Sequence, residues 1–194
     1  MQLLLNQASP YARLARAAVI EKGLADKVEL RWIDPWASPP ELIAANPAAK
    51  VPALITDRGE AIVDSACICM YLDQAGEGPS LFSGSASTLV KYGLGRSLID
   101  VAFGVTIERR YGQPSGVLVQ RWLEAIPRTI AKIEKNAGLL THEPPDVGDL
   151  SIAVGLAYVD FRLQEVRWRT DATRLVQWHE RIGARPSLRK TAPE

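Results

Sequence analysis

The hydrophobic pattern of this chain changes its period once, and that change constrains the fold more than any other feature. Up to Gly76, short apolar runs typical of strands alternate with helical segments, whereas beyond Thr88 almost every segment has a helical period. The stretch between them is rich in Gly, Ser and Pro, as linkers are. We therefore expect an α/β domain over residues 1–77, a linker over 78–86 and an all-helical domain over 87–194.

A β-α-β unit is expected at the start of the first domain. The apolar run Gln2–Leu5 predicts a buried strand, and the alternation of apolar and polar residues in Val28–Ile33 predicts a half-buried one. Ser9 is a favourable N-cap for the helix between them, Pro10 suits its first position, and Gly23 suits the position after its end. Such a unit implies a right-handed crossover between parallel strands.

Four further elements complete the first domain. A short helix is expected around Glu41–Ala45, and the strands Ala53–Thr56 and Ala61–Val63 are expected to form a hairpin. The helix Ser65–Gly76 closes the domain. The predicted order is therefore strand, helix, strand, helix, strand, strand, helix.

The second domain is predicted to be helical throughout. Its expected helices are Leu89–Tyr111, Val117–Leu140, a third within Thr141–Glu165, and Asp171–Ile182. Thr170 is the expected N-cap of the last of these.

Composition argues against several classes of function. Hydrophobic residues make up 47% of the chain and charged residues 23%, and the net charge is +1. Nothing in this balance indicates electrostatic binding to nucleic acid or to a membrane surface. No membrane span or signal peptide is recognised, so a cytoplasmic location is expected. The two cysteines, Cys67 and Cys69, would point to different faces of a helix; we expect buried or half-buried thiols, with no disulfide and no metal site.

Four segments, in order along the chain, carry a resemblance to a known family. They are "SPYARLARAAVIEKG", "NPAAKVPAL", "DSACICMYLD" and "PPDVGDLSIAVGLAYVDFR". Together, at these spacings, they resemble bacterial cytosolic glutathione transferases over essentially the whole chain. The resemblance implies a thioredoxin-like N-terminal domain, an all-helical C-terminal domain and glutathione as co-substrate without a metal. It also implies a capping box at the start of one helix, for which Asp146 and Asp149 have the chemistry.

The resemblance assigns the glutathione-binding residues to one stretch of the chain. Val51-Pro52 would form a cis peptide bond that turns the Val51 N–H and C=O toward an added strand, the cysteinyl backbone of glutathione. At Asp64-Ser65, a helix N-terminus favours the γ-glutamyl carboxylate, and Asp64 faces the ammonium. Lys50 is expected near the glycyl carboxylate. By local chemistry alone, Val51-Pro52 fits a plain strand start and Lys50 a solvated lysine equally well, whereas Asp64-Ser65 fits a plain helix cap better than a ligand site.

Ser9 is the predicted catalytic residue. Thioredoxin relatives carry a C-x-x-C motif where this chain has Ser9–Ala12, and the lack of both thiols excludes dithiol exchange by the protein itself at this site. A hydroxyl at a helix N-terminus can instead donate a hydrogen bond to the thiolate of bound glutathione, which lowers the pKa of that thiol. The alternative activating groups nearby are Asn6, Gln7 and Tyr11.

The second substrate is expected to bind between the domains. The candidates for this electrophile pocket are Tyr11, Trp36, Phe103, Ile107 and Tyr111. Aromatic residues on a long helix more often belong to the core. Arg13 and Arg16 are expected to pair with acids across the domain interface.

The leading hypothesis is a glutathione S-transferase that activates the glutathione thiol for attack on a small hydrophobic electrophile, as in detoxification. The alternatives are a glutathione-dependent peroxidase or disulfide reductase, and a non-catalytic transferase-like binding protein. An apolar excess on the faces of Ser65–Gly76 and Leu89–Ile107 predicts an isologous homodimer, as the resemblance also implies.

Overall fold

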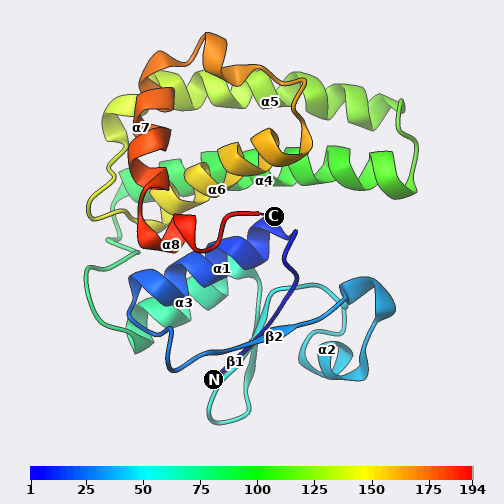
Figure 1. Cartoon of the computed structure of the whole chain (residues 1–194), viewed down its shortest axis with the longest axis vertical. Coiled ribbons are helices and arrows are strands. Elements are labelled where there is room, and N and C mark those ends of the chain that lie inside the picture. The colour runs from blue at the N-terminus through cyan, green and yellow to red at the C-terminus, as the bar shows by residue number, and fades with distance from the viewer. Residues whose placement is uncertain (194) are drawn as a thin grey trace. The chain divides into compact units, whose positions relative to one another are not determined.

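The chain forms two compact units in the computed structural model, which describes residues 1–193 (Figure 1). The first unit comprises Met1–Phe82 together with the chain from Lys190 onward, and the second comprises Ser83–Arg189. The chain therefore passes from one unit to the other after Phe82 and again after Arg189.

A mixed four-stranded sheet is the centre of the first unit. Strand β1 (Gln2–Leu5) pairs in parallel with β2 (Glu29–Trp32) and antiparallel with β3 (Ala53–Ile55), which pairs antiparallel with β4 (Ala61–Val63). The strand order is β2-β1-β3-β4. The predicted β-α-β unit and hairpin are confirmed, and β1 lies in the interior of the sheet.

Two helices pack against each other on one face of the sheet. Helix α1 (Pro10–Glu21) and helix α3 (Ser65–Ala75) lie side by side (Figure 1). Ser9 caps α1, and Gly23 just beyond its end has φ = 65°, a left-handed conformation that glycine adopts at no steric cost. The predicted signals for this helix are confirmed at both ends.

A short helix covers the other face. Leu4 of β1 points to this side, where it packs with Leu42 of α2 (Pro40–Ala45) and with Ala53. The chain enters this region through a 3-10 turn at Pro35–Ala37. Burial of these apolar groups is worth about 1.5–3 kcal/mol for each large side chain, so α2 is held by its packing more than by its own short length.

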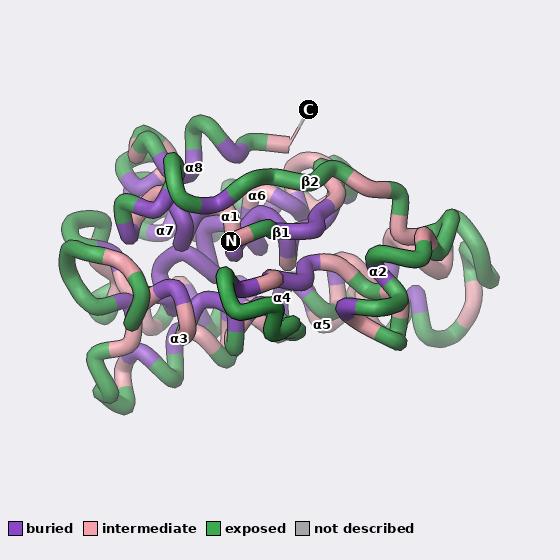
Figure 2. The backbone as a smooth tube through the Cα atoms, turned by 90° about the horizontal axis from the view of Figure 1, so that it is seen from below, coloured by how far each residue is buried: buried purple, intermediate pink, exposed green. Residues whose placement is uncertain are grey.

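The prediction of a half-buried strand over Val28–Ile33 is confirmed at its ends, where Val28 is buried and Ile33 half-buried, but is wrong for the burial of the residues between them. Every residue of β2 is exposed, with Leu30 at 37% and Trp32 at 50%, and Figure 2 draws this strand in the exposed colour. Strand β2 is an edge strand, so it has a neighbouring strand on one side only. The Trp32 ring is covered only in part, by the Arg16 guanidinium 4.9 Å from its centre.

Helices alone build the second unit. They are α4 (Ala86–Tyr111), α5 (Val117–Lys135), α6 (Val147–Arg162), α7 (Thr173–Gly183) and α8 (Pro186–Arg189), with 3-10 turns at Ala137–Leu139 and Trp168–Thr170. The four predicted helices are confirmed. Helix α5 ends earlier than predicted because the chain tightens into the 3-10 turn, and α8 was not predicted.

Glycines allow α4 and α6 to pack closely. A Cβ atom built on Gly95 of α4 would overlap Ser151 of α6, and one built on Gly148 of α6 would lie 2.5 Å from Lys91 Cβ. The first separation, from the Ser151 Oγ, would be shorter still, and both separations are too short for a real Cβ atom. Both positions therefore require glycine for space. This contact brings the first turns of the two helices together.

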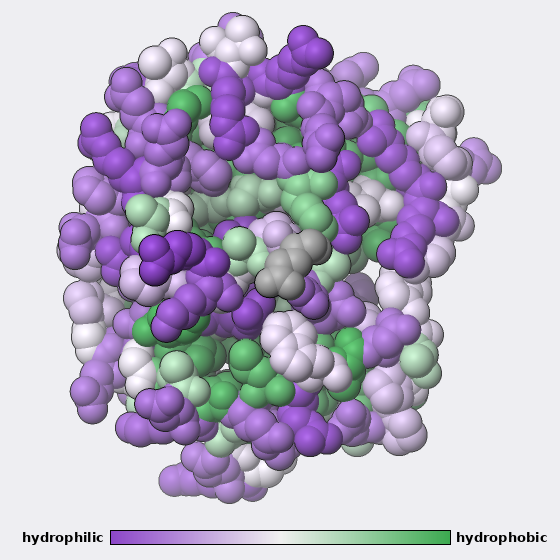
Figure 3. All heavy atoms as spheres, viewed as in Figure 1, coloured by the Kyte–Doolittle hydropathy of each residue, from purple (hydrophilic) through white to green (hydrophobic). Residues whose placement is uncertain are grey.

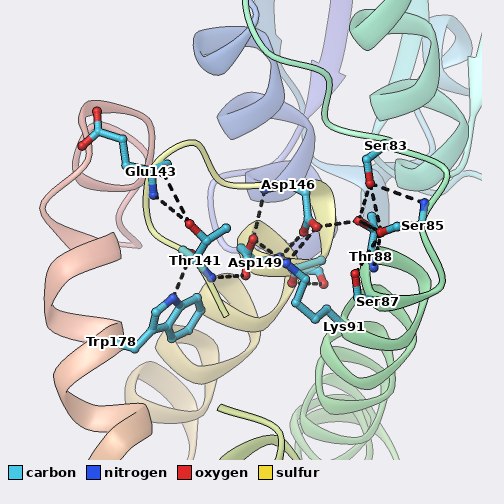
Figure 4. A network of polar contacts seen from close by, with 12 residues as sticks. Ser83, Ser85, Ser87, Thr88, Lys91, Thr141, Glu143, Asp146, Asp149 and Trp178 are labelled. Carbon is cyan, nitrogen blue, oxygen red and sulfur yellow. Dashed lines mark hydrogen bonds and ion pairs between the residues drawn. The ribbon is translucent and has the colours of Figure 1, made fainter. Parts of the chain in front are cut away.

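A buried charge network joins these first turns (Figure 4). Asp146 caps α6, and its carboxylate accepts a hydrogen bond from the Asp149 N–H at 3.0 Å while Asp149 accepts one from the Asp146 N–H at 3.1 Å. The capping box implied by the resemblance is therefore present. The Lys91 ammonium lies 2.8 Å from Asp146 and 2.7 Å from Asp149, and Thr88 donates to Asp146 at 2.6 Å.

The two carboxyl groups of this network have opposite pKa shifts. Burial raises the pKa of Asp149 to about 6, because this fully buried group gains too little from the Lys91 hydrogen bond to offset desolvation. Burial acts in the same direction on Asp146, but hydrogen bonds from Lys91 and Thr88 outweigh it and lower the pKa of that carboxyl. Lys91 thus neutralises a site in which two acids face each other.

The predicted N-cap of the last long helix is wrong. Thr170 belongs to the 3-10 turn, and α7 begins at Thr173 with Ala172 at the N-cap and no capping side chain. The side chains before it explain this, since the Trp168 indole donates to Asp160 at 2.8 Å and Arg169 forms an ion pair with the same carboxylate. These bonds hold the turn in place.

Cys67 is exposed and Cys69 is buried, and both are free thiols. The expectation of at least half-burial is therefore wrong for Cys67. Burial raises the pKa of the Cys69 thiol, which keeps it protonated. Over residues 1–193, no helix is long and apolar enough to cross a membrane, and no group of three His, Cys, Asp or Glu side chains could hold a metal ion.

Replacement of Lys91 by methionine is expected to destabilise the protein by about 3–5 kcal/mol at pH 8, since it leaves a buried carboxylate without its cation. The raised pKa of Asp149 means that this group favours the folded state below its ordinary value of 3.8 and loses that contribution as the pH rises through about 6. The loss in Lys91→Met should therefore be smaller at pH 5 than at pH 8.

Urea unfolding at both pH values measures this difference. Lys132→Met on the exposed side of α5 is the matched control and should change the free energy of unfolding by less than about 0.5 kcal/mol. Equal losses in the two lysine variants would contradict the buried network as a source of stability.

Candidate functional site

The strand register brings three segments together at one end of the strands in the first unit, where β1 and β4 end and β3 begins. We call this end of the sheet the candidate edge. Leu4 of β1 lies opposite Ala53 of β3, so the residues after β1 are adjacent to those before β3. Ala53 also lies opposite Val63 of β4, so the residues after β4 join the same edge. The segments that meet there are Asn6–Ser9, Val51-Pro52 and Asp64-Ser65.

Ser9 presents a hydroxyl group at the N-terminus of α1. Its Oγ accepts a hydrogen bond from the Ala12 N–H at 3.2 Å, and the residue is 8% exposed. No acceptor for the Ser9 hydroxyl proton is found in the described part of the chain. Asn6 holds the preceding loop, since its side chain accepts from the Ala8 N–H at 3.0 Å and donates to the Ile33 carbonyl at 3.4 Å. The Ser9 proton is therefore available to a ligand.

The Val51-Pro52 peptide bond is cis, as the resemblance implied. Pro52 is buried and leads directly into β3, whereas Val51 is half-buried. Neither the N–H nor the C=O of Val51 forms a hydrogen bond with any of residues 1–193. Backbone groups buried away from water are nearly always paired in native proteins, and an extended peptide beside the half-buried Val51 would pair both groups.

Asp64 and Ser65 form the start of α3. Asp64 is the N-cap, and its Oδ1 accepts from the Ala66 N–H at 2.8 Å. Its φ of 72° is one that residues other than glycine rarely adopt, and nothing in the sequence signals it. Ser65 is 2% exposed, and its Oγ has no hydrogen-bond partner among the described residues. A buried hydroxyl without a partner costs about 1–3 kcal/mol, which a ligand acceptor would relieve.

Three other predicted residues belong to the first unit. Lys50 is exposed, its carbonyl accepts from Asn46 Nδ2 at 2.8 Å, and its ammonium forms no hydrogen bond or ion pair with any of residues 1–193. Trp36 is 59% exposed in the turn that follows β2, whose last residue pairs with Leu5 at the end of β1. Tyr11 is half-buried in the first turn of α1. Lys50 and Tyr11 are therefore close in sequence to segments of the candidate edge, and Trp36 follows the strand that pairs with β1.

The remaining candidates for the electrophile pocket lie on α4 in the second unit. Phe103, Ile107 and Tyr111 are spaced four apart and so share one face of this helix. Phe103 and Ile107 are half-buried, Tyr111 is 51% exposed, and the Phe103 ring lies 6.4 Å from that of Tyr158. A separate open cavity of about 310 Å³ beside Trp168 contains none of the predicted site residues.

The edge described above suits an extended ligand with charged ends. Helices α1 and α3 both begin there, and their N-termini favour negative charge. Ser65 offers a hydroxyl to a carboxylate, Asp64 offers a negative charge to an ammonium, and Val51 offers a backbone pair to a peptide. The Ser9 hydroxyl remains for a further anionic group of the ligand.

Models of two domains of a single protein family match this chain. The model described as glutathione S-transferase, N-terminal domain, matches residues 6–80, which include the whole candidate edge. The model described as glutathione S-transferase, C-terminal domain, matches residues 117–181.

Solved structures and a curated relative are similar over the full length. A glutathione transferase family member from Pseudomonas fluorescens Pf-5 with bound glutathione is 30% identical, with a TM-score of 0.89 over 100% of this chain and 98% of that chain. A second structure of that family member, with bound S-(propanoic acid)-glutathione, is 29% identical, with a TM-score of 0.85 and 100% of both chains covered.

The curated relative is the uncharacterized GST-like protein YibF of Escherichia coli K12, 26% identical over 205 residues, which covers 100% of this chain and 98% of the relative. The matched models, the full-length likeness and the thioredoxin-like sheet followed by helices agree with one another. This chain belongs to the glutathione S-transferase family.

Proposed function

We propose that this protein is a glutathione transferase that binds glutathione at the candidate edge of the first unit and activates its thiol with Ser9. The observation that carries the proposal is the set of unsatisfied polar groups at that edge: the Ser9 hydroxyl proton, the Val51 backbone pair and the buried Ser65 hydroxyl. The glutathione found in the Pseudomonas fluorescens relative supports the same ligand.

In the proposed complex, glutathione lies extended along the edge. The γ-glutamyl carboxylate accepts hydrogen bonds from Ser65 at the start of α3, while its ammonium faces Asp64. The cysteinyl backbone pairs with the N–H and C=O of Val51 as a short added strand. Lys50, exposed and without a described partner, is left for the glycyl carboxylate. This arrangement directs the cysteinyl sulfur toward Ser9.

The chemistry then follows from charge stabilisation. The thiol releases its proton to solvent, and the Ser9 hydroxyl donates a hydrogen bond to the resulting thiolate while the α1 N-terminus adds a favourable field. The sulfur lone pair forms a new bond to an electrophilic carbon. The bond to a leaving group breaks with its electron pair, or, in an activated alkene, the displaced π electrons take up a proton from water.

Conjugation at sulfur is favoured over the reductive alternatives by one observation. The Pseudomonas fluorescens relative binds S-(propanoic acid)-glutathione, in which the sulfur already carries an organic group. A transferase must accommodate such a product. Assays with chloronitrobenzenes and activated alkenes should therefore show turnover above that with peroxides or mixed disulfides, and the reverse ranking would favour a reductase.

We also propose a homodimer in the cytoplasm, where glutathione is available. Each unit leaves apolar side chains exposed: Val63 at 38% and Met70 at 48% in the first, and Leu89 at 61% and Val90 at 46% in the second. Figure 3 shows apolar residues reaching the surface on one face among a majority of hydrophilic ones. Exposed apolar side chains, where they gather on a surface, often mark a protein–protein contact.

Replacement of Ser65 by alanine should have opposite effects on stability and on binding. The ligand-free protein should become about 1 kcal/mol more stable, because a buried hydroxyl without a partner is removed. Glutathione should bind about tenfold more weakly, because the carboxylate loses a donor. Urea unfolding and calorimetric titration measure the two quantities.

Ser151→Ala is the matched control for this experiment. Ser151 is equally buried, but its hydroxyl donates to the Gly148 carbonyl at 2.9 Å, so its loss should not stabilise the protein and should leave glutathione affinity unchanged. Unaltered glutathione affinity in Ser65→Ala would remove Ser65 from the proposed site.

Replacement of Ser9 by alanine should raise the pKa of the bound glutathione thiol by about one to two units, toward its free value of about 8.5. Turnover near pH 7 should fall about tenfold or more, and the deficit should shrink at high pH, where the thiol ionises without help. Binding should change little, because Asp64, Ser65 and Val51 remain.

Ultraviolet absorbance of the bound thiolate across pH measures this shift. Ser85→Ala is the matched control, since Ser85 caps α4 with the same bond, 3.2 Å from the Thr88 N–H, in the other unit. Both variants lose a cap worth about 1 kcal/mol, but only Ser9→Ala should move the titration curve. If the titration curves of Ser9→Ala and the wild type coincide, another group activates the glutathione thiol, and Tyr11 or Asn6 would be the next candidate.

Light scattering at micromolar concentration should give twice the single-chain mass of 21.2 kDa. Charged substitutions at the exposed apolar residues, Met70→Glu with Leu89→Glu, should reduce the mass to that of one chain. Val117→Glu is the control, because Val117 is 79% exposed at the start of α5 and outside the faces assigned to the dimer. A wild-type mass of 21.2 kDa would reject the dimer.

A further inference from the structure

The last described residues of the chain are part of the first unit, although they follow a helix of the second. The chain returns to the first unit at Lys190, and Thr191 is 1% exposed there. The Arg16 guanidinium donates to the Lys190 carbonyl at 3.3 Å, and Arg13 Nε donates to the Thr191 hydroxyl at a longer 3.5 Å. The red segment beyond residue 189 therefore lies along α1 (Figure 1).

The two arginines lie on the same face of α1 as Ser9. Positions four and seven residues after Ser9 are Arg13 and Arg16, and residues at this spacing form one stripe on a helix. The step from Lys190 to Thr191 corresponds to the step from Arg16 to Arg13, so this segment runs toward the N-terminus of the helix. Ser9 lies about 6 Å further along the axis, roughly the span of two extended residues.

Arg13 is buried and charged at this contact. Burial, with a smaller effect from the Arg16 charge, lowers the pKa of the Arg13 guanidinium to about 10, so it stays protonated at neutral pH. A buried guanidinium needs polar contacts, and the Thr191 hydroxyl supplies one of them to Arg13 from far along the chain. The position of Arg13, one turn below Ser9, is thereby tied to the returning segment.

We infer that residues 190–193 act as a strap that holds the N-terminal turn of α1, and with it the Ser9 hydroxyl, in the position that activates the glutathione thiol. Thr191 is then a positioning residue of the reaction, acting through Arg13 and α1 without touching either substrate. This inference rests on the proposed function and extends it to a part of the chain far from the glutathione edge in sequence.

The physical reason is the steep dependence of thiolate stabilisation on geometry. A hydrogen bond weakens when its donor moves by a few tenths of an ångström or its angle falls, and the field of a helix N-terminus acts only over its first turn. Looser α1 packing would leave the ligand's charged ends anchored on Asp64, Ser65 and Val51. The looser packing would displace the Ser9 hydroxyl from the glutathione sulfur. The turnover rate at neutral pH would therefore fall more than the affinity for glutathione.

The test compares Thr191→Val, Thr191→Ser, a chain that ends at Arg189, and Lys190→Ala. The valine variant keeps the shape and loses the hydroxyl, whereas the serine variant keeps the hydroxyl. Lys190→Ala is the matched control, because Lys190 contributes its carbonyl and its side chain is exposed. The readouts are the pH titration of the bound glutathione thiolate, calorimetric affinity for glutathione, and amide hydrogen exchange across Pro10–Arg16.

Thr191→Val should raise the pKa of the bound thiol by about half a unit, which is about a threefold loss of thiolate near pH 7. The shortened chain should show a larger shift and faster exchange in α1. Thr191→Ser should restore most of the wild-type titration, and Lys190→Ala should match the wild type. Glutathione affinity should change less than about twofold throughout.

A Thr191→Val protein with reduced stability but an unshifted thiol titration would overturn the inference, since the strap would then be only structural. If the shortened chain does not fold, Thr191→Val decides. A wild type that binds no glutathione would reject the proposed function itself. In that case hydrogen exchange still tests whether residues 190–193 hold α1. Faster exchange at Pro10–Arg16 in Thr191→Val would support this role, and unchanged exchange would reject it.

Discussion

The double burial of strand β1 is the constraint on which the candidate site depends. Leu3, Leu4 and Leu5 are each at most 1% exposed, so this strand must have covered faces on both sides and partners on both edges. Its parallel partner β2 and antiparallel partner β3 then determine which loops share an edge of the sheet. A shift of one residue would move Leu4 away from Leu42 of α2 and onto the face covered by α1 and α3, so the packing on both faces would have to change.

The same capping chemistry serves two purposes in the two units. In the second unit, the Ser85 cap is surrounded by the hydroxyls of Ser83, Ser87 and Thr88, and the cap at Asp146 is paired with a buried lysine. In the first unit, the Ser9 cap keeps a free proton. A helix start with its polar groups satisfied stabilises the fold, whereas one with groups left over can bind a ligand.

Local signals made the fold largely predictable. Ser9, Pro10 and Gly23 act on neighbouring residues only, so their pattern predicted α1 correctly. The exposure of β2 was missed, because alternation shows which residues share a face but not whether anything covers it. The cap predicted at Thr170 was wrong because Asp160, well before it in the chain, binds the residues of the 3-10 turn. Lys91 was missed for the same reason, since its acids lie on another helix.

The sequence by itself determined the division into sheet and helices, the family and the identity of the candidate residues, since these depend on periodicity, caps and motifs read over short spans. Only the tertiary structure decided which polar groups remain unsatisfied at Val51 and Ser65, and that Thr191 docks on Arg13. The physical reason is that a hydrogen bond forms only within about 3.5 Å, so its presence or absence depends on every residue that the fold brings near, however distant in sequence.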